Sequence, residues 1–278
     1  MAWLGYATSY VNGVAWRRHD SGQVSDMSMK ILVCVKRVPM TGGRIVLTDD
    51  EQEIRTQHLG FTISPHEECA VEEAVRIVEA GGGEVVVLAL GPAEAEEQLR
   101  DCMAIGADRG ILIRTDGAEW DPQATAAAIV DAARAEGPFD LLLFGNESAD
   151  SGNYQVGIRV AYALGLPVVT GLKKVDVADG RVRCERDAGG ARDVYETQLP
   201  AVLTVLEGLN LPRYPSVPGR LRAKSKPLAV LEPVRPAPKL EKLRLVLPEG
   251  QGKQAEILGE GAAAAPRVVE VMQSLGVA

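Results

Sequence analysis

The sequence predicts an α/β fold with a doubly wound, mostly parallel sheet. Segments with helical periodicity alternate with apolar runs, as in strand–helix–strand units. The runs hold β-branched residues and leucine almost without interruption, which indicates strands covered on both faces: 30–38, 84–90, 110–115 and 140–145. The 278 residues are 46% hydrophobic and 24% charged, an ordinary globular composition. A chain of this length can bury a core without disulfides or metals.

The helices are predicted from the spacing of their apolar residues. Residues 65–80 carry their apolar side chains on one stripe and glutamates elsewhere. Ser64 can be the N-cap of this helix, Pro65 its first residue and Glu67 the returning partner of a capping box. Further helices are predicted over 92–105, 122–136 and 154–164.

The pattern changes after Pro167. Short alternating runs are separated there by turn signals at 178–180 and 188–190. They predict an antiparallel meander that extends the sheet. From Asn210 the chain becomes rich in proline and basic residues, and a long segment without periodicity is usually functional or disordered. The tail ends in a predicted helix, Pro266 to Leu275.

Residues 1–28 do not match the rest of the chain. Arg17 and Arg18 follow the apolar residues instead of preceding them, so the segment is not typical of a secretory signal. No stretch of about 18 apolar residues occurs, so no membrane span is predicted. We expect residues 1–28 to be a disordered or non-native leader, with the folded unit beginning near Met29.

Charge and cysteine usage exclude several classes of site. The formal net charge is −8, which argues against a general nucleic-acid binder. An anion site would then be local and built largely from backbone N–H groups. Cys34, Cys69, Cys102 and Cys184 are widely spaced and form no C-x-x-C pair. This spacing predicts neither a zinc site nor a redox dithiol, and it fits a reducing cytoplasm.

The sequence contains no recognisable catalytic constellation. It lacks G-x-S-x-G, the Walker loop G-x-x-x-x-G-K-[ST], and a glycine fingerprint after the first strand. His66 beside Glu67 is a weak acid–base candidate, but a position in a first helical turn favours a capping or pocket-wall role. These patterns therefore identify no catalytic residue.

The candidate site lies where the strands end. Ligands of open α/β sheets bind outside the carboxyl ends of the strands, and the segments "VCVKRVP", "SPHE", "ALGP" and "GNESADSGNYQVG" should meet there. Helix N-termini favour anions, and Gly145 and Gly152 allow close backbone approach. Asn146, Ser148 and Asn153 supply neutral hydrogen-bond partners. The residues alone leave two interpretations open, a nucleotide cradle and a solvated loop capped by Asp150 or Ser151.

The sequence resembles the beta subunit of electron-transfer flavoproteins from about Met29 to Ala278. The resemblance rests on "ILVCVKRVP", "ISPHEECAVEEAVRI", "LLLFGNESADSGNYQVG" and above all "LPAVLTVLEGLNLPRYPSVPGRLRAKSKP". It implies an α/β domain that pairs with an alpha subunit carrying the redox-active FAD, and that holds AMP in a structural role. The implied nucleotide-binding residues are Cys34, Ser64, Pro65, His66, Glu67, Leu90, Gly145, Asn146, Glu147, Ser148, Ala149, Asp150, Ser151, Gly152, Asn153, Tyr154, Gln155 and Val156.

The resemblance also gives the basic segment a role. It implies a partner-recognition loop over 211–240, whose anchoring leucine in the family is Val217 here. The loop would dock donor dehydrogenases, such as the acyl-CoA dehydrogenases of fatty acid oxidation, and the electrons would pass to a quinone reductase or similar acceptor. The implied docking residues are Arg213, Tyr214, Val217, Arg220, Arg222 and Lys224. Residues 29–210 would form the nucleotide-binding domain, and 241–278 an arm that packs on the alpha subunit.

Two alternatives remain beside this reading. Some members of the family hold a second FAD in place of AMP and bifurcate electrons, and "YQVG" resembles part of their motif. The second alternative is a stand-alone nucleotide-binding enzyme or sensor that uses His66 or Asp150 on a phosphate. Nucleotide hydrolysis or transfer by the isolated chain would favour it.

Overall fold

The computed structural model describes residues 10–11, 14–15, 28–42, 45–247 and 256–277. The chain divides into two units, Met1–Arg44 with Thr56–Lys242 and Ile45–Arg55 with Leu243–Ala278. The expected leader, residues 1–28, lies outside the described residues except for Ser28 and two short paired strands. These strands are β1 (Tyr10–Val11) and β2 (Val14–Ala15).

A seven-stranded sheet forms the first unit, with the order β14-β7-β6-β3-β8-β13-β9. All neighbouring strands in it run parallel, which confirms the predicted fold class. At its centre Ile31 pairs with Val85 on one side and with Leu141 on the other. The strands are β3 (Met29–Val35), β6 (Gly83–Gly91), β7 (Arg109–Arg114), β8 (Leu141–Gly145), β9 (Val168–Leu172), β13 (Ala201–Val205) and β14 (Leu228–Leu231).

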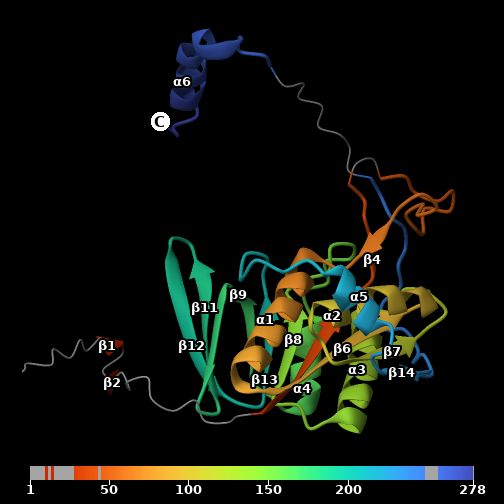
Figure 1. Cartoon of the computed structure of the whole chain (residues 1–278). Coiled ribbons are helices and arrows are strands. Elements are labelled where there is room, and N and C mark those ends of the chain that lie inside the picture. The colour runs from red at the N-terminus through yellow and green to blue at the C-terminus, as the bar shows by residue number, and fades with distance from the viewer. Residues whose placement is uncertain (1–9, 12–13, 16–27, 43–44, 248–255, 278) are drawn as a thin grey trace, which may run out of the picture. The chain divides into compact units, whose positions relative to one another are not determined.

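Helices cover both faces of this sheet (Figure 1). Ile31 and Val33 pack with α1 (Pro65–Gly81) and α2 (Glu96–Ile105), which follows the short 3-10 helix η1 (Ala93–Ala95). Leu32 and Cys34 point to the opposite face and pack with α3 (Pro122–Glu136) and α4 (Val156–Leu164). Because successive strand residues enter different cores, every position is apolar, which explains the unbroken runs.

The predicted meander is wrong for residues 201–205, which pair parallel with β8 in the large sheet; residues 174–198 form a sheet of their own. Its strands are β10 (Lys174–Ala178), β11 (Arg181–Ala188) and β12 (Ala191–Gln198), joined by turns at the predicted glycines. Strand β9 pairs parallel to β13 in the large sheet, and after Lys173 the chain pairs antiparallel with β11 instead. The bend at Lys173 therefore separates the two sheets, and the alternating pattern alone did not reveal it.

The basic, proline-rich segment is more regular than the sequence suggested. It contains the helix α5 (Val217–Ala223) and the strand β14, which pairs parallel with β7 from Leu228↔Gly110 onward. Strand β14 thereby covers the exposed edge of β7. The prolines that flank β14 conceal it in the sequence. A small antiparallel pair, β4 (Val38–Pro39) with β5 (Phe61–Thr62), extends from the end of β3.

The second unit contains the predicted C-terminal helix. The 3-10 helix η2 (Gly261–Ala264) leads into α6 (Ala265–Ser274), which has no buried residue. Elsewhere in this unit, the Leu245 amide donates to the Glu51 carbonyl at 2.7 Å, and the Gln52 side chain donates to the Leu243 carbonyl at 2.8 Å. Among the described residues, no helix is both long and apolar enough to span a membrane.

Candidate nucleotide-binding site

The carboxyl ends of β3, β6 and β8 bring the predicted site residues to one edge of the sheet. Cys34 and Leu90 lie near the ends of β3 and β6, and Gly145 is the last residue of β8. The N-terminus of α1 packs against Gly145 through His66 and Glu67. The loop from Asn146 to Gln155, which leads into α4, continues from the same point. The elements thus meet as strand topology predicted.

Gly145 marks the tightest approach in this site. A Cβ atom built on it would lie 2.8 Å from Cγ of Glu67, 3.1 Å from Cβ of His66 and 3.2 Å from the Glu147 carbonyl oxygen. No larger residue fits there without moving the start of α1. The close backbone approach also expected at Gly152 is different in kind. A Cβ there would touch nothing nearer than 3.5 Å, and the constraint is a φ of +54°.

Hydrogen bonds tie the start of α1 to the loop. The Ala149 amide donates to the Ser64 hydroxyl at 2.9 Å. Oε2 of Glu67 accepts from the backbone amides of Ser64 and Lys36, each at 3.1 Å. Glu67 is therefore the returning partner of the predicted capping box, and it also fixes the end of β3. Glu67 is 6% exposed, and burial raises its pKa to about 8 although both amides and the Lys36 ammonium oppose the shift.

Lys36 is the central cation of the site, and the sequence did not single it out. Its ammonium lies 2.7 Å from Oδ2 of Asp150 and donates to the Ser151 hydroxyl at 3.1 Å. Burial alone would raise the pKa of Asp150, but Lys36 and the hydrogen bonds around the carboxylate lower it below the usual value. The sequence predicted that backbone amides would build this region and did not identify Lys36.

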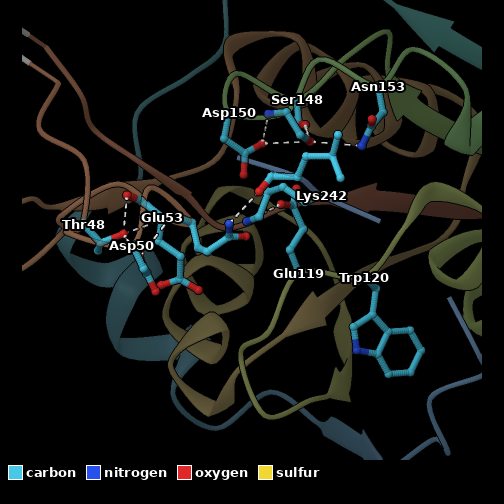
Figure 2. Close-up of polar contacts among 12 residues, drawn as sticks. Thr48, Asp50, Glu53, Glu119, Trp120, Ser148, Asp150, Asn153 and Lys242 are labelled. Atoms are coloured by element: carbon cyan, nitrogen blue, oxygen red, sulfur yellow. Dashed lines mark hydrogen bonds and ion pairs between the residues drawn. The ribbon is translucent and has the colours of Figure 1, made fainter. Parts of the chain in front are cut away.

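Ser151 is the centre of a hydroxyl network in the loop. Its hydroxyl lies 3.0 Å from that of Ser148 and accepts from the Asn153 amide group at 3.2 Å (Figure 2). The carboxylate of Glu119 lies 3.8 Å from Lys36 and 3.5 Å from the Lys242 ammonium. Lys36 therefore ties this loop to the end of β3 through Asp150 and Ser151.

A second link holds the beginning of the loop to β13 and β9. The Thr204 hydroxyl donates to Oδ1 of Asn146 at 2.7 Å and accepts from the Gly171 amide at 3.1 Å. The Asn146 amide donates to the Val205 carbonyl at 2.9 Å. Thr204 is buried within an apolar strand, and a polar residue at such a position is the signal that could have identified it.

Several groups in the site are suited to a nucleotide. Nδ1 of His66 is buried and has no hydrogen-bond partner within the described residues, so it is available to a bound polar group. Gly145 lets the N-terminus of α1 pack closely on the end of β8, and Tyr154 lies further along the loop with a φ of +55°. Burial raises the pKa of the Cys34 thiol, which suits a packing role and not that of a nucleophile. These features fit an adenine nucleotide.

Glu67 makes the stability of the chain depend on pH. Burial raises the pKa of Glu67 in the folded state to about 8, so the protonated carboxyl stabilises the fold. This stabilisation is complete below the pKa of the unfolded state and is lost as the pH rises through about 8. We expect wild type to lose free energy of unfolding, on the order of a few kcal/mol, between about pH 5 and pH 9. Glu67→Gln should remove most of this loss, whereas the exposed control Glu241→Gln should keep it. Urea denaturation at both pH values measures the difference, and parallel losses in all three proteins would refute the role of Glu67.

The predicted docking residues lie in residues 211–224, here named the docking segment. Tyr214 is 95% exposed and Val217 is 73% exposed at the start of α5. Arg220, Arg222 and Lys224 are also exposed and give the segment a basic rim. Two of the arginines are paired with helices of the first unit: Arg213 with Glu72 and Glu79 of α1, and the exposed Arg220 with Asp101 of α2. Arg213 alone among them holds two carboxylates.

Neither metal nor disulfide chemistry is visible in the described part of the chain. No group of three or more histidine, cysteine, aspartate or glutamate residues in it is arranged to hold a metal ion. All four cysteines are buried and carry free thiols.

Comparisons with known proteins identify relatives of this chain. The model of the electron transfer flavoprotein domain matches residues 53–235. The chain is 38% identical over 249 residues to the electron transfer flavoprotein subunit beta of Syntrophomonas wolfei, covering 89% of this chain and 97% of the relative. It is 33% identical to the same subunit of Bacillus subtilis over 254 residues, covering 88% and 98% of the two chains.

A third relative has a different name. The caffeyl-CoA reductase-Etf complex subunit CarD of Acetobacterium woodii is 34% identical over 205 residues, covering 73% of this chain and 78% of the relative. The family model spans the nucleotide loop, the docking segment and every strand of the large sheet except β3. The chain belongs to the electron transfer flavoprotein family, among its beta subunits.

Proposed function

We propose that this chain binds AMP at the carboxyl edge of its sheet as the beta subunit of a heterodimeric electron carrier. The observation that supports this most strongly is the convergence at Gly145. There the end of β8, the N-terminus of α1 and the Lys36-bound loop meet around a position with no room for a side chain. His66 offers a buried, unpartnered nitrogen in the same place. The chain would hold the nucleotide without reacting with it.

The redox chemistry would belong to the alpha subunit. The FAD held mainly by that subunit supplies the electron transfer when it is bound. This chain would form one wall of the FAD site and keep its nucleotide loop ordered through Lys36 and Asp150. The exposed helix α6 has no buried residue in its own unit, which supports a role in packing against the alpha subunit. The chain would turn over no substrate of its own.

The docking segment would receive the electron donors. Val217 is a small apolar residue surrounded by arginines and lysine on an otherwise acidic chain. A basic rim steers an acidic partner and a small apolar contact permits rapid release, which suits a carrier that meets several dehydrogenases. We propose acyl-CoA dehydrogenases as donors and a quinone reductase or similar protein as acceptor.

A second candidate is a beta subunit that holds a second FAD in place of AMP. Similarity to the CarD subunit, which by its name belongs to an Etf complex with a caffeyl-CoA reductase, favours keeping this candidate. The same loop and the same edge of the sheet would bind the adenylate half in both cases. The identity of the released nucleotide separates the two.

Reconstitution tests the carrier function. The chain purified alone should lack a strong flavin spectrum, whereas the complex with its alpha subunit should be yellow. An acyl-CoA substrate with its dehydrogenase should bleach that flavin. If the flavin is not reduced by any physiological dehydrogenase tried, the proposed carrier function is wrong.

A further inference from the structure

Arg213 lies in the docking segment, but its guanidinium is turned onto α1. Nε donates to Oε2 of Glu72 at 2.9 Å and Nη2 donates to Oε1 of Glu72 at 3.1 Å. The same group donates from Nη1 and Nη2 to the two oxygens of Glu79, at 2.7 and 2.9 Å. The backbone amide of Arg213 also donates to Oε2 of Glu72 at 3.1 Å. One arginine is thus held by two carboxylates, through its side chain and its backbone.

This arrangement needs arginine and not merely a positive charge. Glu72 and Glu79 are seven residues apart on α1, which places them on one side of the helix two turns apart. A planar guanidinium can serve both carboxylates at once, whereas an ammonium has no such fork. Glu72 is only 2% exposed, and burial opposes its ionisation, but the bonds from Arg213 lower its pKa below the usual value. The hydrogen bonds that Arg213 donates to Glu79 and then to Glu72 raise the pKa of Arg213.

A second contact attaches the chain to α1 just before the docking segment. The Asn210 side-chain amide donates to the Cys69 carbonyl at 3.0 Å and to Oε2 of Glu73 at 2.9 Å. The far end is held by α2, where Nη1 of Arg100 donates to the carbonyls of Ala223 and Lys226 at 2.8 and 2.7 Å. Between these attachments the apolar side chains stay exposed to solvent: Leu211, Tyr214, Val217 and Leu221.

We propose that Arg213 is a positioning residue that pre-orders the docking segment before a partner arrives. A segment that is ordered in advance loses less conformational entropy on binding, so it binds more tightly with the same contacts. The inference rests on the proposed docking function. It assigns to Arg213 no contact with the partner, because its donors already serve Glu72 and Glu79. The helix that receives Arg213 also begins at the nucleotide site, so α1 positions both functional regions.

The test uses the intact heterodimer carrying Arg213→Lys, with an acyl-CoA dehydrogenase as donor. We expect the KM for the heterodimer to rise about fivefold to tenfold while kcat changes less than about twofold, because ordering affects association and not the electron-transfer step. Amide hydrogen exchange in residues 211–216 should become faster, and exchange in β3 and β8 should not change. Chemical reduction of the flavin by dithionite should proceed as in wild type.

Three further variants make the result decisive. We call the bonds from Arg213 to Glu72 and Glu79 the Arg213 clamp. Glu79→Gln removes only its exposed half and should raise the KM by a smaller factor. Arg181→Lys alters an exposed arginine–glutamate pair of the meander, with Glu196 at 3.1 Å, and should change neither quantity. If Val217→Asp raises the KM but Arg213→Lys changes neither the KM nor exchange, the clamp is refuted and docking stands. If Val217→Asp also has no effect, docking itself is refuted and the clamp falls with it.

Discussion

The substitution Gly145→Val is expected to strip the nucleotide from the heterodimer. A Cβ at this position would already lie within 3.2 Å of three groups, on α1 and on the loop, and valine adds two methyl groups to it. Overpacking of this kind costs about 1–3 kcal/mol or more. Much of that cost should appear as weaker nucleotide binding, because α1 and the loop must move apart to admit the side chain. Since about 1.4 kcal/mol corresponds to a factor of ten, we expect AMP content to fall about tenfold.

The measurement is nucleotide released by acid from equal amounts of purified heterodimer. The matched control is Gly42→Val, the same change at a described glycine where an added Cβ meets nothing within 4 Å. This control should retain wild-type AMP. If Gly145→Val also retains a full complement of AMP while the protein is folded, the nucleotide does not sit at the junction of β8 and α1.

The substitution Val217→Asp is expected to slow electron transfer from the donor about tenfold or more. Val217 is 73% exposed at the first turn of α5, so the change costs the free chain little. In the docked complex the carboxylate would be placed without a partner in an apolar pocket, which is strongly unfavourable. Assembly with the alpha subunit and AMP content should remain as in wild type.

Stopped-flow reduction of the heterodimer by a reduced acyl-CoA dehydrogenase measures this effect. Val194→Asp is the matched control, since Val194 is an exposed valine on β12 of the meander. Its rate should match that of wild type. Equal rates for Val217→Asp and wild type would show that the donor docks elsewhere.

The large sheet could be predicted from the sequence because its physical signal is local. Residues 85–90 and 141–144 are apolar at every position since both faces of the sheet are covered, and that property is visible without any partner. Strand β9 carried no such signal, because Thr170 and Gly171 interrupt its short apolar run. Strand β14 was hidden by Pro227 and Pro233. Its place is fixed by pairing with β7, a partner more than a hundred residues away.

The location of the candidate site could be predicted from the sequence, but the side-chain contacts that hold it could not. Strand topology placed Ser64, Glu67 and Gly145 together, because parallel strands end at one edge of the sheet. The role of Lys36 depends on its distance to Asp150 and Ser151, and 115 residues separate Lys36 from Ser151 along the chain. No sequence pattern around a lysine that follows a strand predicts which residue it will pair with. Arg213 was placed in the docking surface for the same reason, because nothing local indicated the carboxylates of α1.

The most direct test of the account is the identity of the small molecules that the assembled heterodimer holds. Mass spectrometry of the acid extract, quantified against protein, measures them without any assay of activity. We predict one AMP and one FAD for each heterodimer. Two FAD molecules and no AMP would select the second candidate and leave the adenylate site in place. One FAD with no further nucleotide would contradict the claim that the carboxyl edge of this sheet is a nucleotide site.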